Sequence, residues 1–347
     1  MPKNAAVGLD IGTSSIKVVE LQRRGNAIQL EHFGIQPIPY GLLEGGAIQS
    51  PPVIADNIRA LLAQARLKVK RAVIAVAGQT IVVRHAKFPI MDKEELANAI
   101  RYEADRYIPF PLDEACLDFA IVSSDETNNE MEVMLVAAQR KLIESHIVSL
   151  NTAGIQPLAI DVQPFALIRA LGLLANQIPG VTAILDIGAG TSDLLIYKGG
   201  SPRFTRIIPI AGTRITQAIA NAYGCSFDEA ERLKIAYSDA LGKRTEPDAV
   251  KVYKAMRDTL DELVLEVRRS IDYYRLQQRN EEVTQVIIAG GGAKMLNIEE
   301  LFSRELGIRV SKGNSLYLLN SANITDEIID LAPILSVSIG LALREVE

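Results

Sequence analysis

One strand–turn–strand pattern occurs twice in this chain of 347 residues, at Val7–Leu21 and again at Thr182–Tyr197. In each copy an apolar run leads into Asp-Ile-Gly, followed by small, mostly hydroxylated residues and a second apolar run. The triplets begin at Asp10 and Asp186 (186 − 10 = 176 residues apart), so the offset is about half the chain. A repeat at this spacing predicts two equivalent α/β lobes that face each other. The alternative is chance recurrence of a short glycine hairpin.

The turns of both copies have the chemistry of a phosphate site. Small side chains, hydroxyls and backbone N–H groups follow a strand that ends in a carboxylate, Asp10 or Asp186. Such groups bind phosphate oxygens, and the carboxylates can hold the waters of a Mg²⁺ ion. We therefore predict that the two turns clamp a triphosphate, although each turn alone also fits an ordinary hairpin. The candidates are Asp10, Gly12, Thr13, Ser14, Ser15, Lys17, Asp186, Gly188, Gly190, Thr191 and Ser192, with Asp10 and Asp186 as metal ligands.

A third glycine-rich turn follows the apolar strand expected at Thr284–Ala289. Gly290, Gly291 and Gly292 would let the backbone approach a flat ligand closely, because glycine has no side chain. A plain strand-to-helix turn is the alternative, but three successive glycines exceed what such a turn requires. These glycines therefore join the candidates for cofactor binding.

Residues 80–161, between the two copies, are predicted to form a small inserted α+β unit with the order strand, helix, strand, strand, helix, strand. A helix at Pro164–Leu174 would leave this unit and connect the lobes, and an apolar helix at Ile334–Arg344 mirrors it. The fold class expected is α/β with two lobes. The predicted ranges are 1–79 plus 162–175 for the first lobe, 180–220 plus 283–347 for the second, and 221–282 for a helical subdomain of the second lobe.

Composition narrows the class of partner. The net charge is −5 without a basic block, which argues against a nucleic-acid binder. Cys116 and Cys225 lie far apart and are expected to be free thiols in a reducing compartment. The start of the sequence has no room for a signal peptide, and the most apolar segment, Leu331–Leu343, is too short to cross a bilayer. A cytoplasmic protein that reaches a membrane only through partners is expected.

The order and spacing of these motifs resemble the actin-like ATPase superfamily, which includes actin, heat-shock chaperones, sugar kinases and the cell-division protein FtsA. The resemblance covers essentially the whole chain and implies a duplicated ribonuclease H-like fold with ATP and Mg²⁺ between the lobes. Asp10–Lys17 and Asp186–Asp193 are similar to its two phosphate loops, and Ile287–Lys294 to its adenosine motif. Glu231 and Lys234 are similar to a helix that approaches the ribose. The resemblance thus adds Gly212, Thr213, Glu231, Lys234 and Lys294 to the cofactor-binding candidates.

Within the superfamily the chain most resembles the PilM family of type IV pilus assembly proteins. The stretches that carry this resemblance are Gly8–Leu21, Tyr102–Pro111, Asp161–Phe165 and Gly340–Arg344. Tyr102–Pro111 is the most specific, since it has no phosphate role, and it lies in the inserted unit, at the position of the FtsA-type subdomain. FtsA usually ends in a basic amphipathic membrane helix. The sequence stops at Glu347 without such a helix, which favours PilM.

This resemblance implies a scaffold or signalling protein at the inner membrane, held there through a partner. It would bind the cytoplasmic tail of the membrane protein PilN in a groove beside the inserted unit, and would contact other components of the pilus platform. Weak self-association is left open. For Tyr107, Ile108, Pro109 and Phe110 two interpretations stand side by side: a rigid apolar wall for an extended peptide, or a helix stop that packs its aromatics into the core.

Hydrolysis of ATP needs a group that orients or deprotonates the attacking water. Gln163 matches by motif the water-positioning glutamine of actin, and Asp161 is the other catalytic candidate. Asp161 fits better as a helix cap before Pro164. Tight ATP binding with slow or negligible turnover is therefore expected. The competing functions are an FtsA-like filament former and a sugar-kinase-type phosphotransferase, for which the sequence offers no catalytic base apart from Asp161.

Overall fold

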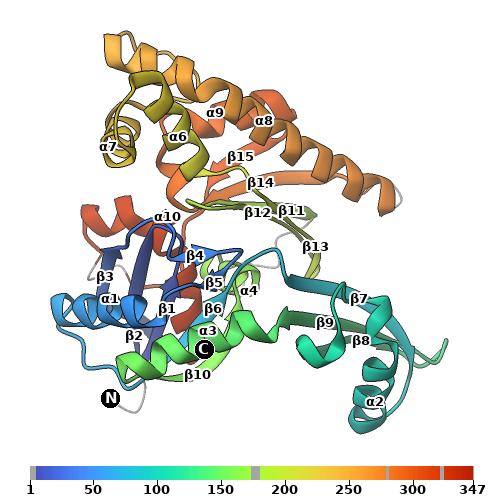
Figure 1. Ribbon diagram of the computed structural model, residues 1–347. Coiled ribbons are helices and arrows are strands. Elements are labelled where there is room, and N and C mark those ends of the chain that lie inside the picture. The colour runs from blue at the N-terminus through green and yellow to red at the C-terminus, as the bar shows by residue number, and fades with distance from the viewer. Residues whose placement is uncertain (1–4, 173–179, 279–280, 321–323, 347) are drawn as a thin grey trace.

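The structure is a computed structural model that describes residues 5–172, 180–278, 281–320 and 324–346. Within these residues the chain forms two lobes, each built around a five-stranded sheet, and a smaller subdomain beside the first lobe (Figure 1). The last residues of the predicted helix at Pro164–Leu174 and of the predicted range 162–175 lie outside the described residues.

The two large sheets have equivalent topology. The first has the order β10-β6-β1-β2-β3 and the second the order β15-β14-β11-β12-β13. In each, the hairpin strands pair antiparallel, and the next core strand, β6 or β14, runs parallel to β1 or β11. The two lobes predicted from the repeat, and the α/β class, are therefore confirmed. The strands are β1 (Ala5–Ile11), β2 (Ser15–Arg24), β3 (Ala27–Pro37), β6 (Arg71–Val76), β10 (Gln156–Val162), β11 (Val181–Ile187), β12 (Ser192–Lys198), β13 (Ser201–Ile208), β14 (Val283–Ala289) and β15 (Arg309–Lys312).

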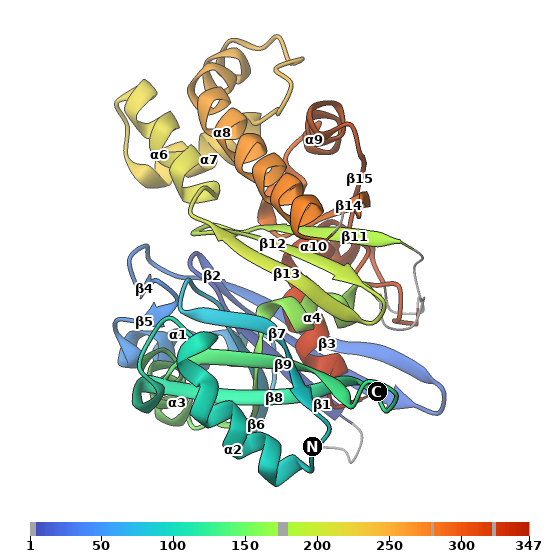
Figure 2. The same ribbon diagram turned by 90° about the vertical axis from the view of Figure 1, so that its right-hand side faces the viewer.

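Helices cover both faces of each sheet (Figure 2). On the first lobe α1 packs beside α3, and α10 covers the opposite face of β1 and β2. On the second lobe α6, α8 and α9 share one core with the sheet. Two short strands of two residues each, β4 and β5, form a hairpin that precedes α1. The bounds are β4 (Leu43–Glu44), β5 (Ala47–Ile48), α1 (Pro51–Gln64), α3 (Arg140–Ala153), α4 (Gln163–Ala170), α6 (Gly212–Tyr223), α7 (Phe227–Tyr237), α8 (Pro247–Gln277), η3 (Gly291–Lys294), α9 (Ile298–Leu306) and α10 (Asp326–Leu343).

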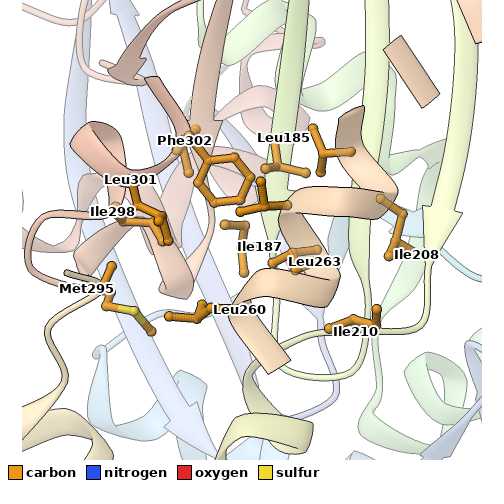
Figure 3. Packing of buried hydrophobic residues seen from close by; sticks show 14 of the residues in the cluster. Leu185, Ile187, Ile208, Ile210, Leu260, Leu263, Met295, Ile298, Leu301 and Phe302 are labelled. Atoms are coloured by element: carbon orange, nitrogen blue, oxygen red, sulfur yellow. The ribbon is translucent and has the colours of Figure 1, made fainter. Parts of the chain in front are cut away.

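The core of the second lobe forms where α8 and α9 meet β11. Leu185 and Ile187 of β11 face Leu260 and Leu263 of α8, and Phe302 of α9 fills the space above them (Figure 3). The apolar residues of α8 recur every three or four positions, so one side of this long helix is buried along most of its length. This buried side packs α8 against β11, the strand that leads into the second turn.

The last helix corrects one predicted range. α10 was expected within the second lobe, as part of 283–347, but it lies on β1 and β2 of the first lobe and crosses α4. Most of its residues are apolar and buried. A helix that is apolar on all sides needs partners on all sides. The space between the lobes supplies them, and α4 and α10 together connect the two sheets.

The inserted subdomain is smaller than predicted. Its sheet has the order β7-β9-β8 and is covered by α2, whose N-terminus is capped by the side chain of Asp92. The helix and strand that complete the predicted unit at 80–161 belong instead to the first lobe, because β10 pairs with β6 and α3 packs on α1. The elements are β7 (Ile81–Pro89), α2 (Lys93–Glu103), η1 (Ala104–Arg106), η2 (Leu112–Glu114), β8 (Ala115–Asp125) and β9 (Glu130–Gln139).

Candidate functional site

The first hairpin turn is closed by its own backbone. β1 and β2 pair in register up to the turn, and Gly12 N donates to the carbonyl oxygen of Ser15 (3.1 Å). Asp10 and Lys17 are opposite each other on the ladder, and Lys17 Nζ lies 3.1 Å from Asp10 Oδ2. Lys17 therefore contacts the carboxylate beside the turn and is not simply solvated.

The second hairpin turn has the same geometry. Gly188 N donates to the carbonyl oxygen of Thr191 (3.0 Å), the equivalent of the bond in the first turn. Asp186 stands opposite Asp193 on the ladder, so a carboxylate occupies the position that Lys17 has in the first lobe. Thr191 Oγ1 donates to Asp193 Oδ2 (3.0 Å). The second turn is thus the more acidic of the two.

The two turns border one cavity of about 910 Å³ between the lobes. They approach so closely that a Cβ on Gly190 would lie 2.7 Å from Thr13 Oγ1. A cavity of this size fits a drug- or cofactor-sized ligand. Nearly all the predicted site residues line it: Asp10, Gly12, Thr13, Ser14, Ser15, Lys17, Gln163, Asp186, Gly188, Gly190, Thr191, Gly212, Thr213, Glu231, Lys234, Gly290, Gly291, Gly292 and Lys294. The structure brings these residues together, and their contact with a ligand remains a prediction.

The three-glycine turn forms another wall of the cavity. Gly290 has a φ of +79°, and a Cβ on it would lie 2.2 Å from Asp186 Oδ1. A Cβ on Gly291, in contrast, would meet no atom within 4 Å. Gly290 is therefore required by the backbone and by its neighbour, whereas Gly291 leaves open space over which a flat group can lie.

A polar cluster on α6 and α7 forms the side wall in the second lobe. α6 begins at Gly212, whose N donates to the carbonyl oxygen of Gly188 (3.1 Å), so this helix start is attached to the second turn. Lys234 Nζ donates to Glu231 Oε2 (2.7 Å), to Thr216 Oγ1 (2.9 Å) and to the carbonyl oxygen of Gly212 (3.3 Å). These bonds hold Glu231 and Lys234 at the cavity wall.

The carboxylates at the turns carry negative charge that the protein only partly offsets. Burial, and then the charge of Asp10, raise the pKa of Asp186 to about 6, against the opposing effects of Gln163 and Lys17. Burial and the nearby Asp186 raise the pKa of Asp193 to about 7. A bound cation would relieve this repulsion.

Mg²⁺ fits this donor set only with help from a ligand. No group of three or more His, Cys, Asp or Glu side chains is arranged to hold a metal by itself in the part of the chain that the structure describes. Mg²⁺ commonly takes one or two carboxylates and completes its octahedron with waters and phosphate oxygens. Asp10 and Asp186 could supply those carboxylates.

Asp161 was predicted as a catalytic candidate or as a helix cap, and the structure places it in neither position. It does not line the cavity, and the residue that caps α4 is Val162. The Asp161 carboxylate is buried and pairs with Arg169 of α4 and with Arg344, which follows α10. Its role is to join the two helices that connect the lobes.

Ser192 is also removed from the predicted site. Its side chain is fully buried and donates to the carbonyl oxygen of Ile210 (2.6 Å), away from the cavity. Ser192 therefore holds the base of the second turn in place.

Lys294 does line the cavity, but its Nζ pairs with Asp330 of α10 (2.5 Å).

Several cavity residues were missed in the sequence. They come from the first lobe: Tyr40 follows β3, Gly45 and Gly46 lie in the β4–β5 hairpin, Gln79 precedes β7, and His146 is on α3. The paired glycines were a signal of close backbone approach, but nothing local marked the other residues. Burial lowers the pKa of His146, which favours its neutral form.

The segment predicted to bind a partner lies in the inserted subdomain after η1. Ile108 is buried in its core, and Tyr107 and Phe110 pack against that core while part of each stays accessible. Pro109 is exposed. The segment thus packs its aromatics inward and still presents an apolar edge, so both interpretations describe part of it.

The family model described as type IV pilus assembly protein PilM matches residues 8–346. The chain belongs to the PilM family. A chain in the solved PilM-PilN type IV pilus biogenesis complex superposes with a TM-score of 0.87 and 32% sequence identity, and the match covers 99% of this chain and 98% of that one. The resemblance drawn from the sequence is thereby confirmed.

More distant relatives support the actin-like fold. FtsA of Bacillus subtilis is 25% identical over 354 residues, covering 89% of this chain and 78% of FtsA. MreB5 of Spiroplasma citri, solved bound to AMPPNP, superposes with a TM-score of 0.56 at 14% identity, covering 99% of this chain and 97% of MreB5. Among the described residues of this PilM-family chain, no helix combines the length and the apolar character needed to span a bilayer.

Proposed function

We propose that this PilM-family protein binds ATP, with Mg²⁺, between its lobes and acts as a nucleotide-controlled scaffold in type IV pilus assembly. The observation that carries the proposal is the cavity that both hairpin turns and the three-glycine turn line together. Each turn offers backbone N–H groups and hydroxyls to phosphate oxygens. The AMPPNP-bound MreB5 structure, which shares the fold, supports a nucleotide as the ligand.

Different residues of the cavity would bind different parts of the nucleotide. The two turns would bind the phosphates, and Asp10 and Asp186 would hold a Mg²⁺ ion that neutralises phosphate charge. Gly291 lies at the open wall where the purine would sit, and Glu231 and Lys234 lie at the side wall where the ribose would sit. The raised pKa of Asp186 supports a site that gains from an added cation.

We expect hydrolysis to be slow or absent. Gln163 is the remaining catalytic candidate, and its Nε2 donates to Asp186 Oδ2, so it is engaged with a carboxylate in this state. Steady-state phosphate release should therefore be close to the blank in the wild-type protein. Rapid turnover that collapses in Gln163→Ala would contradict this expectation.

We propose further that the protein binds the cytoplasmic tail of PilN beside the inserted subdomain and is held at the inner membrane in this way. The likeness to a chain of a PilM-PilN complex supports PilN as the partner. The accessible edges of Tyr107 and Phe110, with Pro109 beside them, are the apolar wall proposed for an extended peptide.

A fluorescent PilN tail peptide tests this surface by anisotropy. Phe110→Ala should weaken binding about tenfold or more, while Tyr273→Ala, at an exposed aromatic in the second lobe, should leave it unchanged. Circular dichroism checks that each variant is folded. A folded Phe110→Ala protein with wild-type affinity would exclude this wall, and no binding by the wild type would exclude the partner.

FtsA-like filament formation is the second candidate function, since the match to FtsA covers 89% of this chain and 78% of FtsA. Light scattering and pelleting with ATP and Mg²⁺ separate the two. The scaffold proposal expects the protein to stay small and in the supernatant. Nucleotide-dependent pelleting would favour the filament.

A further inference from the structure

A contact between described residues joins the inserted subdomain directly to the second lobe. β13 of the second lobe runs down to β7 of the subdomain (Figure 1). The contact consists of His85 on β7, Glu132 on β9, and Pro202 and Arg203 at the start of β13. These four residues are called the latch below.

Glu132 is the centre of the latch. Its Oε1 accepts a bond from Arg203 Nη1 (2.6 Å) and lies 2.9 Å from His85 Nδ1. The other ring nitrogen of His85 contacts the carbonyl oxygen of Pro202. The side chains of His85, Glu132 and Arg203 are 18%, 25% and 28% exposed, so these charges are shielded from solvent more than an ordinary surface ion pair is.

Two of the three strands that carry the latch, β7 and β13, lead to the cavity. Gly78 and Gln79, just before β7, line it, and so does Pro209, just after β13. Each strand is therefore fixed at the cavity at one end and joined to the other strand by the latch. Because hydrogen-bonded strands move as units, a change in the angle between the lobes must displace the latch partners relative to each other.

One buried donor in the latch makes the joined state less favourable. Among the residues that the structure describes, the buried Arg203 Nε has no hydrogen-bond partner. A buried donor without a partner is unfavourable, and it regains water as soon as the contact separates. The joined state therefore carries an unsatisfied donor that water would reach when the contact separates.

We propose that the latch couples nucleotide binding to the position of the inserted subdomain: a nucleotide that closes the lobes also fixes the subdomain against the second lobe. The inference rests on the proposed nucleotide site. A ligand shifts such an equilibrium only by binding the two states differently. The lobes meet at the cavity in the joined state, so a ligand held by both turns favours that state.

Hydrogen exchange measured by mass spectrometry with AMPPNP and Mg²⁺ tests the coupling. In the wild-type protein AMPPNP should slow exchange at both turns, 10–15 and 186–192, and also about threefold or more at 81–89 and 198–204. In Arg203→Ala and in Glu132→Gln the slowing at the turns should remain, and the slowing at 81–89 should be lost.

The matched control is Lys87→Ala. Lys87, also on β7, pairs with Glu130 of β9 (2.6 Å), and these two side chains are 70% and 43% exposed, so the pair is more solvated than the latch. This variant should keep the wild-type response throughout. Urea unfolding shows whether the two latch variants keep a stable fold, and the Glu132→Gln change keeps side-chain size.

Two results would overturn the coupling: slowing at 81–89 that is unchanged in both latch variants, or wild-type slowing confined to the turns. Absence of slowing at the turns in the wild type would instead overturn the nucleotide site, and the latch proposal with it. The pattern of slowed segments therefore distinguishes the two failures.

Discussion

At the scale of single residues, neighbouring glycines of the third turn have different tasks. Gly290 has left-handed backbone and no room for a Cβ beside Asp186, whereas Gly291 faces open space in the cavity. The two positions therefore separate the demands of folding from those of ligand binding.

Gly290→Ala should destabilise the protein by about 2–4 kcal/mol, because it combines left-handed strain with a steric clash. Gly291→Ala should leave the free energy of unfolding within about 0.5 kcal/mol of wild type but weaken ATP binding, because its methyl group enters the open wall. Urea unfolding and calorimetric titration measure the two effects. Equal stability losses in both variants would contradict this division.

A buried carboxylate in the second lobe, Asp239, gives a pH-dependent prediction. It accepts hydrogen bonds from Asn297 Nδ2 (2.7 Å) and from the backbone N–H groups of Leu241, Lys243 and Arg244. Burial alone would raise the pKa of Asp239, but these bonds outweigh it and lower the pKa below its usual value. The ionised form therefore stabilises the fold.

Asp239→Asn should cost about 2–3 kcal/mol at pH 7, since bonds to a charged acceptor are lost. The folded-state pKa is lower than the unfolded one, so this stabilisation is complete above about pH 4 and disappears as the pH falls through the folded value. Urea unfolding from pH 7 to pH 3 should show the gap between wild type and variant shrinking. A gap independent of pH would refute the assignment.

Residue roles were predictable where the partners are close in sequence. The turns at Asp10 and Asp186 combine strand, glycine and hydroxyl within a few positions, and the structure gathers nearly all of them at the cavity. The role of Asp161 was not predicted, because one of its two partners, Arg344, is remote in the chain. The prediction for Ser192 failed because its hydroxyl donates to the carbonyl oxygen of Ile210, in the connection after β13, which no local pattern reveals.

At the scale of elements, the same limit explains the misplaced boundary of the inserted subdomain. Helix α3 and strand β10 were identified as elements, but their assignment depends on β10 pairing with β6, across the whole insertion. Periodicity identifies an element and does not identify its sheet. Likewise the apolar character of α10 predicted burial and not which lobe it would cover.

A contact between elements at the cavity gives a kinetic prediction. The ring of Tyr40, after β3, stacks on Phe227 at the start of α7, with centroids 5.3 Å apart, so it links the two lobes at the cavity. Such a pair contributes about 0.5–1.5 kcal/mol. Phe227→Ala and Tyr40→Ala should therefore speed release of a fluorescent ATP analogue about two- to tenfold in stopped-flow displacement.

Tyr40→Phe is the control, because it keeps the ring, and its release rate should equal that of the wild type. The double variant should be no faster than the quicker single one if the two rings act as a pair. If both alanine variants release the ATP analogue at the wild-type rate, the stacked rings do not retain the nucleotide.

At the scale of the whole molecule, the duplicated lobes bring together turns that are far apart in sequence. The α4 and α10 helices, joined through Asp161, hold the two sheets back to back, and the latch adds a second connection through the inserted subdomain. The cavity borders both turns, and Gly78, Gln79 and Pro209, beside the two strands that meet at the latch, line it as well. That arrangement suits a switch whose output is a surface for a partner.

The central claim is that both turns bind one nucleotide, and calorimetric titration with ATP and Mg²⁺ tests it most directly. The wild type should bind one ATP per chain, and Asp10→Ala should abolish binding without loss of fold. The control is Glu20→Ala. Glu20 is on the same hairpin, but its carboxylate pairs with His32 outside the cavity, so this variant should bind ATP with the wild-type affinity. Absence of ATP binding in the wild type, or wild-type affinity in Asp10→Ala, would contradict the account.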